Sequence, residues 1–201
     1  GSSGMSVAII DKKGDYGAVI VSESNLRIDK SEFLISKDTG ILLLQNEVTD
    51  EVNVVASRKA IEVGAKVWLN AAPAKTISKE LLKNLDLLVV NRPEGEFYRD
   101  LLRSNESSHI IKIFTFGAEG LKVQFPDKQP QHHDAYSIKE KSAHGAGDMF
   151  VGALAAHYIK NNKFSESLNY AQAAAAIKVS RNVNETTPIK EQDVIRFIQN
   201  H

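Results

Sequence analysis

Between residues 41 and 115, short apolar runs of strand length alternate with longer helical segments, and this alternation constrains the fold more than any other feature. The apolar runs lie at residues 41–45, 66–70, 87–91 and 110–115. Helical segments are expected between them at 50–63, 78–83 and 94–102, with Gly64 ending the first. Repeated units of this kind predict an α/β fold, a three-layer, mostly parallel sheet with helices on both faces.

The start of the chain departs from this alternation. β-Branched runs at 7–11 and 18–21, joined by a polar turn at 12–15, predict a hairpin. We therefore expect three parts: residues 1–4 as an expression scar, 5–24 as the hairpin, and 25–201 as a single α/β domain.

The rhythm also changes after Gly117. Runs at 121–125 and 135–138 predict short antiparallel strands, with prolines breaking the segment between them. Three helices are expected to complete the chain, at about 147–161, 165–179 and 190–200.

Composition excludes several classes of function. The chain has 25 Lys and Arg residues and 25 Asp and Glu residues, so its net charge is zero and gives no electrostatic footprint for nucleic acid or anionic lipid. It has no cysteine, which excludes disulfides and thiolate metal sites. No apolar run reaches the length of a membrane span, and we expect a cytoplasmic protein that does not bind membranes.

Residues 142–148 carry the most informative chemistry of the chain. Gly145, Ala146 and Gly147 leave backbone N–H groups unhindered at the start of an apolar helix, where the helix dipole favours an anion. Asp148 follows in the first turn. An anion pocket beside a carboxylate base is what phosphoryl transfer to a hydroxyl requires. The alternative is a plain strand-to-helix turn in which Asp148 only caps the helix.

Three further motifs follow predicted strands. They are Gln45 with Glu47, Asn91 with Glu94, and Thr115 with Gly117. Because ligands of open parallel sheets bind beyond the carboxyl ends of the strands, the pattern places all three along one rim. Each has a simpler alternative: Glu94 as an acid at a helix start after Pro93, Thr115 as an ordinary strand end, and Glu47 as an exposed surface acid.

With these motifs in order, the sequence resembles the ribokinase-like (PfkB) carbohydrate kinase family. The resemblance rests on residues 142–148 and continues through 69–74, 91–94, 115–120 and 170–180. It implies a kinase that transfers the γ-phosphoryl group of ATP to a sugar hydroxyl, with Mg²⁺ as cofactor and ATP and a small sugar as its ligands.

The resemblance also implies a role for each matching residue. Asp148 is the catalytic base, and Gly145, Ala146 and Gly147 form the anion hole. Asn91 and Glu94 organise the nucleotide phosphates and Mg²⁺, with Glu94 reaching the metal through water. The nucleotide loop comprises Thr115, Gly117, Glu119 and Gly120, while Gln172 lines the adenine pocket and Glu47 contacts the sugar.

The sequence departs from the family pattern in two places. Ser142 and Ala143 replace an Asp-Thr pair of the family's monovalent cation site, and residues 182–185 replace its glycine-rich loop, which argues against K⁺ activation. The family's N-terminal third, which holds much of the sugar pocket, has no counterpart before Val7.

These departures leave other functions open. A catalytically impaired remnant that binds nucleotide or only assembles with partners is one alternative, and a nucleoside kinase is another. Loss of the N-terminal third would also expose a sheet edge, which promotes pairing between chains. We therefore expect a homodimer formed through the N-terminal hairpin and that edge.

Overall fold

The computed structural model describes residues 3–10, 16–30, 33–182 and 184–201. Its contacts divide the chain into two compact units, Gly1–Ile110 and Ile111–His201. The predicted turn at 12–15 lies outside the described residues, as do residues 1–2 of the predicted scar, residue 11 of the first predicted strand and residue 183 of the 182–185 segment.

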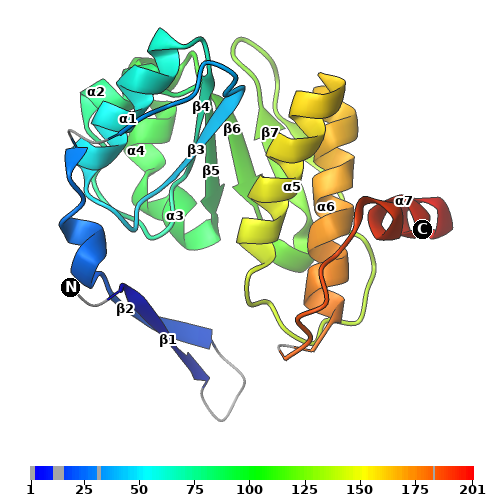
Figure 1. The fold of residues 1–201 in the computed structure, drawn as a ribbon. Coiled ribbons are helices and arrows are strands. Elements are labelled where there is room, and N and C mark those ends of the chain that lie inside the picture. The colour runs from blue at the N-terminus through cyan, green and yellow to red at the C-terminus, as the bar shows by residue number, and fades with distance from the viewer. Residues whose placement is uncertain (1–2, 11–15, 31–32, 183) are drawn as a thin grey trace. The chain divides into compact units, whose positions relative to one another are not determined.

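Three parallel strands form the centre of the first unit (Figure 1). β3 (Ile41–Gln45) pairs with β4 (Lys66–Asn70), and β4 pairs with β5 (Leu87–Asn91). Gln45 lies opposite Asn70, and Asn70 lies opposite Val89, so the carboxyl ends of the strands share one edge. β4 and β5 are buried along nearly their whole length, as their continuous apolar runs predict.

The helices of this unit begin at side-chain caps. α1 (Asp50–Glu62) starts at Thr49, whose hydroxyl accepts a hydrogen bond from the Val52 N–H, and α2 (Lys79–Asn84) starts at Ser78 in the same way. Gly64, just beyond α1, has a φ of 80°. Each cap matches the predicted start or end within one residue.

The predicted helix at 94–102 is instead two short helices. α3 (Arg92–Phe97) and α4 (Arg99–Arg103) meet at Tyr98, followed by the 3₁₀ turn η3 (Asn105–Ser107). Tyr98 is 4% exposed and its hydroxyl is committed to tertiary hydrogen bonds, so packing overrides the helical periodicity there.

The N-terminal hairpin is confirmed. β1 (Met5–Ile10) and β2 (Tyr16–Val21) pair antiparallel, with Met5 opposite Val21 and Ile10 opposite Tyr16. Both strands start two residues earlier than predicted. The 3₁₀ turn η1 (Glu23–Leu26) follows the hairpin.

Three antiparallel strands open the second unit. β6 (Ile111–Thr115) pairs with β7 (Leu121–Gln124) across the 3₁₀ turn η4 (Gly117–Glu119), and β7 pairs with β8 (Gln131–His133). The prediction of a strand at 135–138 is wrong, because the strand lies earlier, at β8. Ladder pairing ends at His133, where the backbone passes against Gly120.

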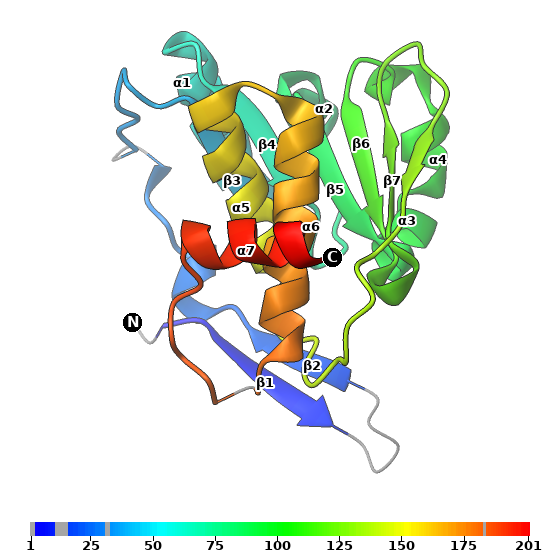
Figure 2. The same ribbon diagram turned by 90° about the vertical axis from the view of Figure 1, so that its right-hand side faces the viewer.

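Three helices complete the second unit, close to their predicted bounds. α5 (Ala146–Asn161) and α6 (Phe164–Ser180) lie side by side, and α7 (Glu191–Asn200) packs against α6 (Figure 2). The packing between α6 and α7 is centred on Ala173, Ala174, Ile177 and Val194. With parallel strands and helices in the first unit and antiparallel strands in the second, the fold is of the α/β class, as expected.

None of the helices in the described part of the chain has the length and apolar character that a bilayer crossing needs.

Tyr98 braces the carboxyl edge of the parallel strands. Its hydroxyl accepts hydrogen bonds from Asn46 Nδ2 at 3.0 Å and from the Lys75 N–H at 2.9 Å, and it donates to the Lys75 carbonyl. Asn46 Nδ2 also donates to the Ala71 carbonyl at 3.2 Å. One phenol therefore joins the loops after β3 and β4 to the junction of α3 and α4.

We expect Tyr98→Phe to lower the free energy of unfolding by about 1–3 kcal/mol, because two buried donors lose their acceptor while the ring volume is kept. Urea unfolding followed by circular dichroism measures the change. Tyr170→Phe is the matched control, since no hydrogen bond of the Tyr170 hydroxyl is found among the described residues. Equal stability of Tyr98→Phe and wild type would show that the phenol does not brace this edge.

Candidate functional site

The N-terminus of α5 is built by a glycine in the left-handed conformation. Gly145 is the N-cap, with φ 72° and ψ 11°, and no side chain caps the helix. The Ala146 N–H donates to the Ala143 carbonyl at 3.2 Å, and the Met149 N–H donates to the Gly145 carbonyl at 3.0 Å. The first turn of a helix leaves N–H groups without intrahelical partners, and the dipole makes that end favourable for an anion.

Gly147 and Asp148 are exposed at this helix end. A Cβ added to Gly147 would meet nothing within 4 Å, so the backbone there is open to a ligand. Asp148 is the third residue of α5, and the N-cap position belongs to Gly145. Asp148 is therefore not the N-cap residue, and its carboxylate lies in the first turn, where the helix dipole favours negative charge.

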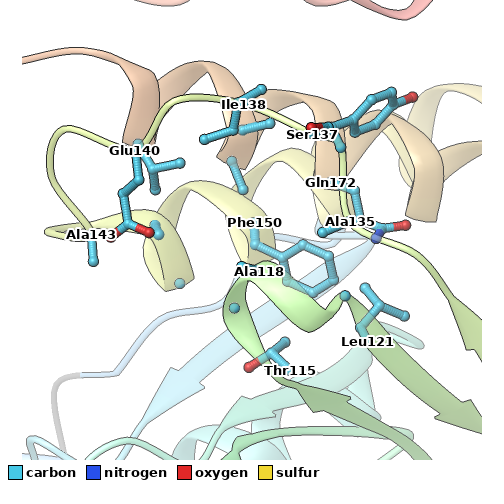
Figure 3. A pocket seen from close by; sticks show the side chains of 18 residues that line it. Thr115, Ala118, Leu121, Ala135, Ser137, Ile138, Glu140, Ala143, Phe150 and Gln172 are labelled. Atoms are coloured by element: carbon cyan, nitrogen blue, oxygen red, sulfur yellow. The ribbon is translucent and has the colours of Figure 1, made fainter. Parts of the chain in front are cut away.

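A cavity of about 490 Å³ adjoins this helix end, entirely within the second unit (Figure 3). Ala143 lies at one end of it, and Gln172, Ala135 and Ser137 lie at the other. Ala146 and Gly147 also line it, and the hydrogen bond from the Ala146 N–H to the Ala143 carbonyl places them near the Ala143 end. Phe150 lies between the two ends. The volume falls in the range of small-ligand pockets.

The predicted nucleotide loop forms one wall of the cavity. Thr115, Gly117 and Gly120 line it, and a tight turn closes the loop: the Phe116 N–H donates to the Gly120 carbonyl at 2.8 Å and the Gly120 N–H to the Gly117 carbonyl at 3.0 Å. Gly120 has a φ of 85°, and a Cβ there would lie 2.1 Å from the His133 carbonyl oxygen. Only glycine allows this loop to pack against the end of β8.

Gln172 lines the cavity as predicted. Its Nε2 donates to the Asp134 carbonyl at 3.0 Å, so the side chain also holds the start of the segment that follows β8.

The structure brings six predicted residues together around this cavity: Thr115, Gly117, Gly120, Ala146, Gly147 and Gln172. Glu119, Gly145 and Asp148 do not line it, although all three directly flank residues that do. Asn91, Glu94 and Glu47 belong to the first unit.

Sequence reasoning missed two parts of the lining. One is the segment after β8, where Tyr136 and Ile138 contribute. The other is the part of α6 beyond Gln172, where Ala175, Ala176 and Val179 share a face with it. The α6 positions follow i, i+3, i+4, i+7 spacing, which marks a single helix face, so starting from Gln172 this periodicity would have found them.

In the first unit, Asn91 and Glu94 form a reciprocal capping box at the start of α3. The Glu94 N–H donates to Asn91 Oδ1 at 2.9 Å, and the Asn91 N–H donates to Glu94 Oε2 at 2.8 Å. Asn91 Nδ2 donates to Glu94 Oε1 at 3.0 Å. The helix-start alternative for Glu94 is therefore real.

Glu94 is 6% exposed as a residue, and burial of its carboxyl raises the pKa despite the hydrogen bonds from Asn91, which lower it. Each carboxylate oxygen accepts one hydrogen bond and keeps a lone pair. Glu47, two residues after β3, is half-buried.

Among the described residues, no group of three or more His, Cys, Asp or Glu side chains is arranged to hold a metal ion by itself. Mg²⁺ does not need such a cage, because it keeps several waters and takes its other oxygens from one or two carboxylates and from substrate phosphates. The remaining lone pairs of Glu94 fit a water-mediated contact of this kind without breaking the capping box.

Comparisons with known proteins agree with this geometry. The family of pfkB carbohydrate kinases matches residues 4–189. A ribokinase from Haemophilus influenzae is 26% identical over 214 residues, covering 98% of this chain and 69% of the relative. The chain therefore belongs to the pfkB family of carbohydrate kinases, and the resemblance noted from its motifs is confirmed.

Solved structures show the same fold. The structure of Arabidopsis thaliana ribokinase complexed with ribose and ATP matches with a TM-score of 0.81 at 20% identity, covering 98% of this chain and 69% of that chain. A nucleoside kinase from Methanocaldococcus jannaschii, an archaeal member of the ribokinase family, matches with a TM-score of 0.82 at 18% identity, covering 98% and 68%.

We expect Gly120→Ala to destabilise the protein by about 3 kcal/mol or more, because a left-handed alanine and a backbone clash with His133 add together. Gly117→Ala is the matched control. Gly117 also has a positive φ, of 62°, but its added Cβ would meet nothing within 4 Å, so the expected cost is about 1–2 kcal/mol. Urea unfolding of both variants checks the difference, and equal losses would contradict the close approach.

Proposed function

We propose that this chain is an ATP-dependent carbohydrate kinase that transfers the γ-phosphoryl group to a sugar hydroxyl. The observation that carries the proposal is the cavity whose one end lies at the open N-terminus of α5, next to Asp148 in the first turn. A small-molecule pocket, an anion site and a carboxylate base meet there.

The shape of the cavity supports an elongated nucleotide. Along α6 the lining runs from Gln172 to Val179, and seven residues of helix span about 10 Å. We assign the base to the end near Gln172 and Ser137, and the phosphates to the end near Ala146 and Gly147. Only the second end offers helix N–H groups for negative charge.

Asp148 supplies the base of the reaction. Its carboxylate accepts the proton of the sugar hydroxyl as the hydroxyl oxygen bonds to the γ-phosphorus. The bond from the γ-phosphorus to the bridging oxygen breaks, and ADP leaves with that oxygen. Gly145 and Gly147 present N–H groups to the charge that develops on the transferring group, whereas the Ala146 N–H donates to the Ala143 carbonyl at 3.2 Å.

We assign Asn91 and Glu94 to the nucleotide phosphates and to Mg²⁺, with Glu94 acting through water. Bound Mg²⁺ neutralises charge on the phosphate oxygens. The capping box holds the Asn91 and Glu94 side chains in one arrangement. This supports a fixed position of the Glu94 carboxyl for its contact with the metal through water. Replacement of the family's Asp-Thr pair by Ser142 and Ala143 supports catalysis without K⁺.

The acceptor is a small sugar, for which Glu47 is a hydrogen-bonding candidate at the end of β3. A nucleoside acceptor is the second candidate, because a nucleoside kinase shares this fold. Release of ADP with a panel of pentoses, hexoses and nucleosides separates the two. A chain that binds nucleotide but releases no ADP with any of them would support the remnant instead.

Asp148→Asn should lower kcat by about 10²- to 10⁴-fold, because the amide cannot accept the proton, while nucleotide affinity changes little. Glu166→Gln is the matched control, since Glu166 is an exposed acid in the first turn of the neighbouring helix α6. ADP release measures turnover. Turnover of Asp148→Asn equal to that of wild type would remove this residue from the mechanism.

Nucleotide binding is tested on the same two variants. Mg-ATP at 100 times its Kd stabilises a folded protein by about 2.7 kcal/mol, which raises the melting temperature. We expect this shift in wild type, in Asp148→Asn and in Glu166→Gln. Its absence in all three would count against both the kinase and a nucleotide-binding remnant.

We also propose a homodimer formed through the hairpin and the edge of β3. Among the described strands β3 pairs only with β4, and Leu43 on it is 41% exposed. An unpaired edge with an apolar side chain favours association. Light scattering at micromolar concentration should give twice the monomer mass. Leu43→Lys should shift this mass toward the monomer, and a wild-type mass of one chain would contradict the dimer.

A further inference from the structure

One wall of the cavity has no regular secondary structure. Residues 134–143 lie in neither a helix nor a strand, although Tyr136, Ser137 and Ile138 line the cavity. Among the described residues, backbone hydrogen bonds from the Lys141 and Ser142 N–H groups to the Val179 carbonyl, at 2.8 and 3.1 Å, hold the C-terminal end of this segment on α6, and side-chain contacts hold the part at 134–138.

Two side-chain hydrogen bonds tie this segment to α6. The Tyr136 hydroxyl donates to Asn169 Oδ1 at 2.8 Å, and Gln172 Nε2 donates to the Asp134 carbonyl at 3.0 Å. Asn169 and Gln172 are three residues apart, so both ties come from the same stretch of the helix. These two hydrogen bonds involve the Tyr136 hydroxyl and the Asp134 carbonyl. The Tyr136 ring itself packs against another element.

The C-terminal helix α7 is that element. The Phe197 ring meets the Tyr136 ring edge-on, with centroids 5.1 Å apart and planes at 70°. The His201 ring stacks on the Phe197 ring, and the two ring centroids are 4.1 Å apart. Tyr136 and Phe197 also pack against the cluster formed by Ala173, Ala174, Ile177 and Val194. Figure 2 shows α7 lying across α6.

We propose that α7 positions the nucleotide base: Phe197 holds Tyr136 in place at the base end of the cavity, so that the packing of α7 sets nucleotide affinity and base selection. This inference rests on the proposed function, because it takes the cavity to be the nucleotide site. Phe197 does not line the cavity and acts through Tyr136, which makes it a positioning residue.

The core of the second unit offers a way to separate this role from stability. Leu154 on α5 is 0% exposed, and it neither lines the cavity nor belongs to the cluster against which Tyr136 packs. Leu154→Ala should therefore destabilise the protein without moving the cavity wall. Phe197→Ala should move the wall.

The experiment measures the Kd of ADP and of GDP by isothermal titration calorimetry for four proteins: wild type, Phe197→Ala, Phe197→Leu and Leu154→Ala. We expect Phe197→Ala to raise the Kd of ADP about five- to tenfold, as loss of an aromatic pair implies. The ratio of the GDP Kd to the ADP Kd should fall toward one. Phe197→Leu removes the ring but keeps a large apolar side chain in the packing between α6 and α7. It should show the same rise in the Kd of ADP if Phe197→Ala fails to fold.

The control decides between positioning and stability. Leu154→Ala should lower the melting temperature but leave both Kd values within about twofold of wild type. Wild-type affinity and selectivity in the Phe197 variants would overturn the inference, and so would equal losses of affinity in Leu154→Ala. A folded wild type that binds neither nucleotide would overturn the proposed function and this inference together.

Discussion

The left-handed turn at Gly145 is the constraint on which the site depends. Because this residue sits at φ 72°, the chain enters α5 abruptly and the first N–H groups of a 16-residue helix face open space beside the cavity. A Cβ at Gly145 would lie 3.4 Å from Lys178 Cε, which is an ordinary contact, so the positive φ and not a lack of space favours glycine there. The backbone conformation thus places Gly147 and Asp148 before any side chain contributes.

The helices and strands could largely be predicted from the sequence because local signals agree with burial. β4 and β5 are continuous apolar runs, and Thr49, Ser78 and Gly64 mark helix ends by their own chemistry. The predicted bounds were wrong where tertiary contacts determine the start or end of an element. Tyr98 interrupts a helical pattern because its hydroxyl bonds Asn46 and Lys75, and β8 forms where Gly120 admits its backbone.

The candidate site shows the same division. Motifs at Thr115, Gly120 and Gln172 could be chosen from the sequence, and all three line one cavity. The wall at 135–138 could not, because its position comes from Asn169 and Phe197, residues more than 30 positions away in the chain. Neither partner has a sequence signature of its own, since each resembles an ordinary residue of an amphipathic helix.

The cavity exists because α6 presents small side chains where a core helix usually presents large ones. Ala175 and Ala176 face the space that Leu or Ile side chains would fill, while α7 covers the other side of the helix through Val194. One face of α6 packs against α7, and another face carries short side chains beside the cavity. The helix is therefore held in place while an opening of ligand size remains. The core that stabilises this unit and the cavity therefore share one helix. In the proposal made above, this is why the packing of α7 affects nucleotide affinity.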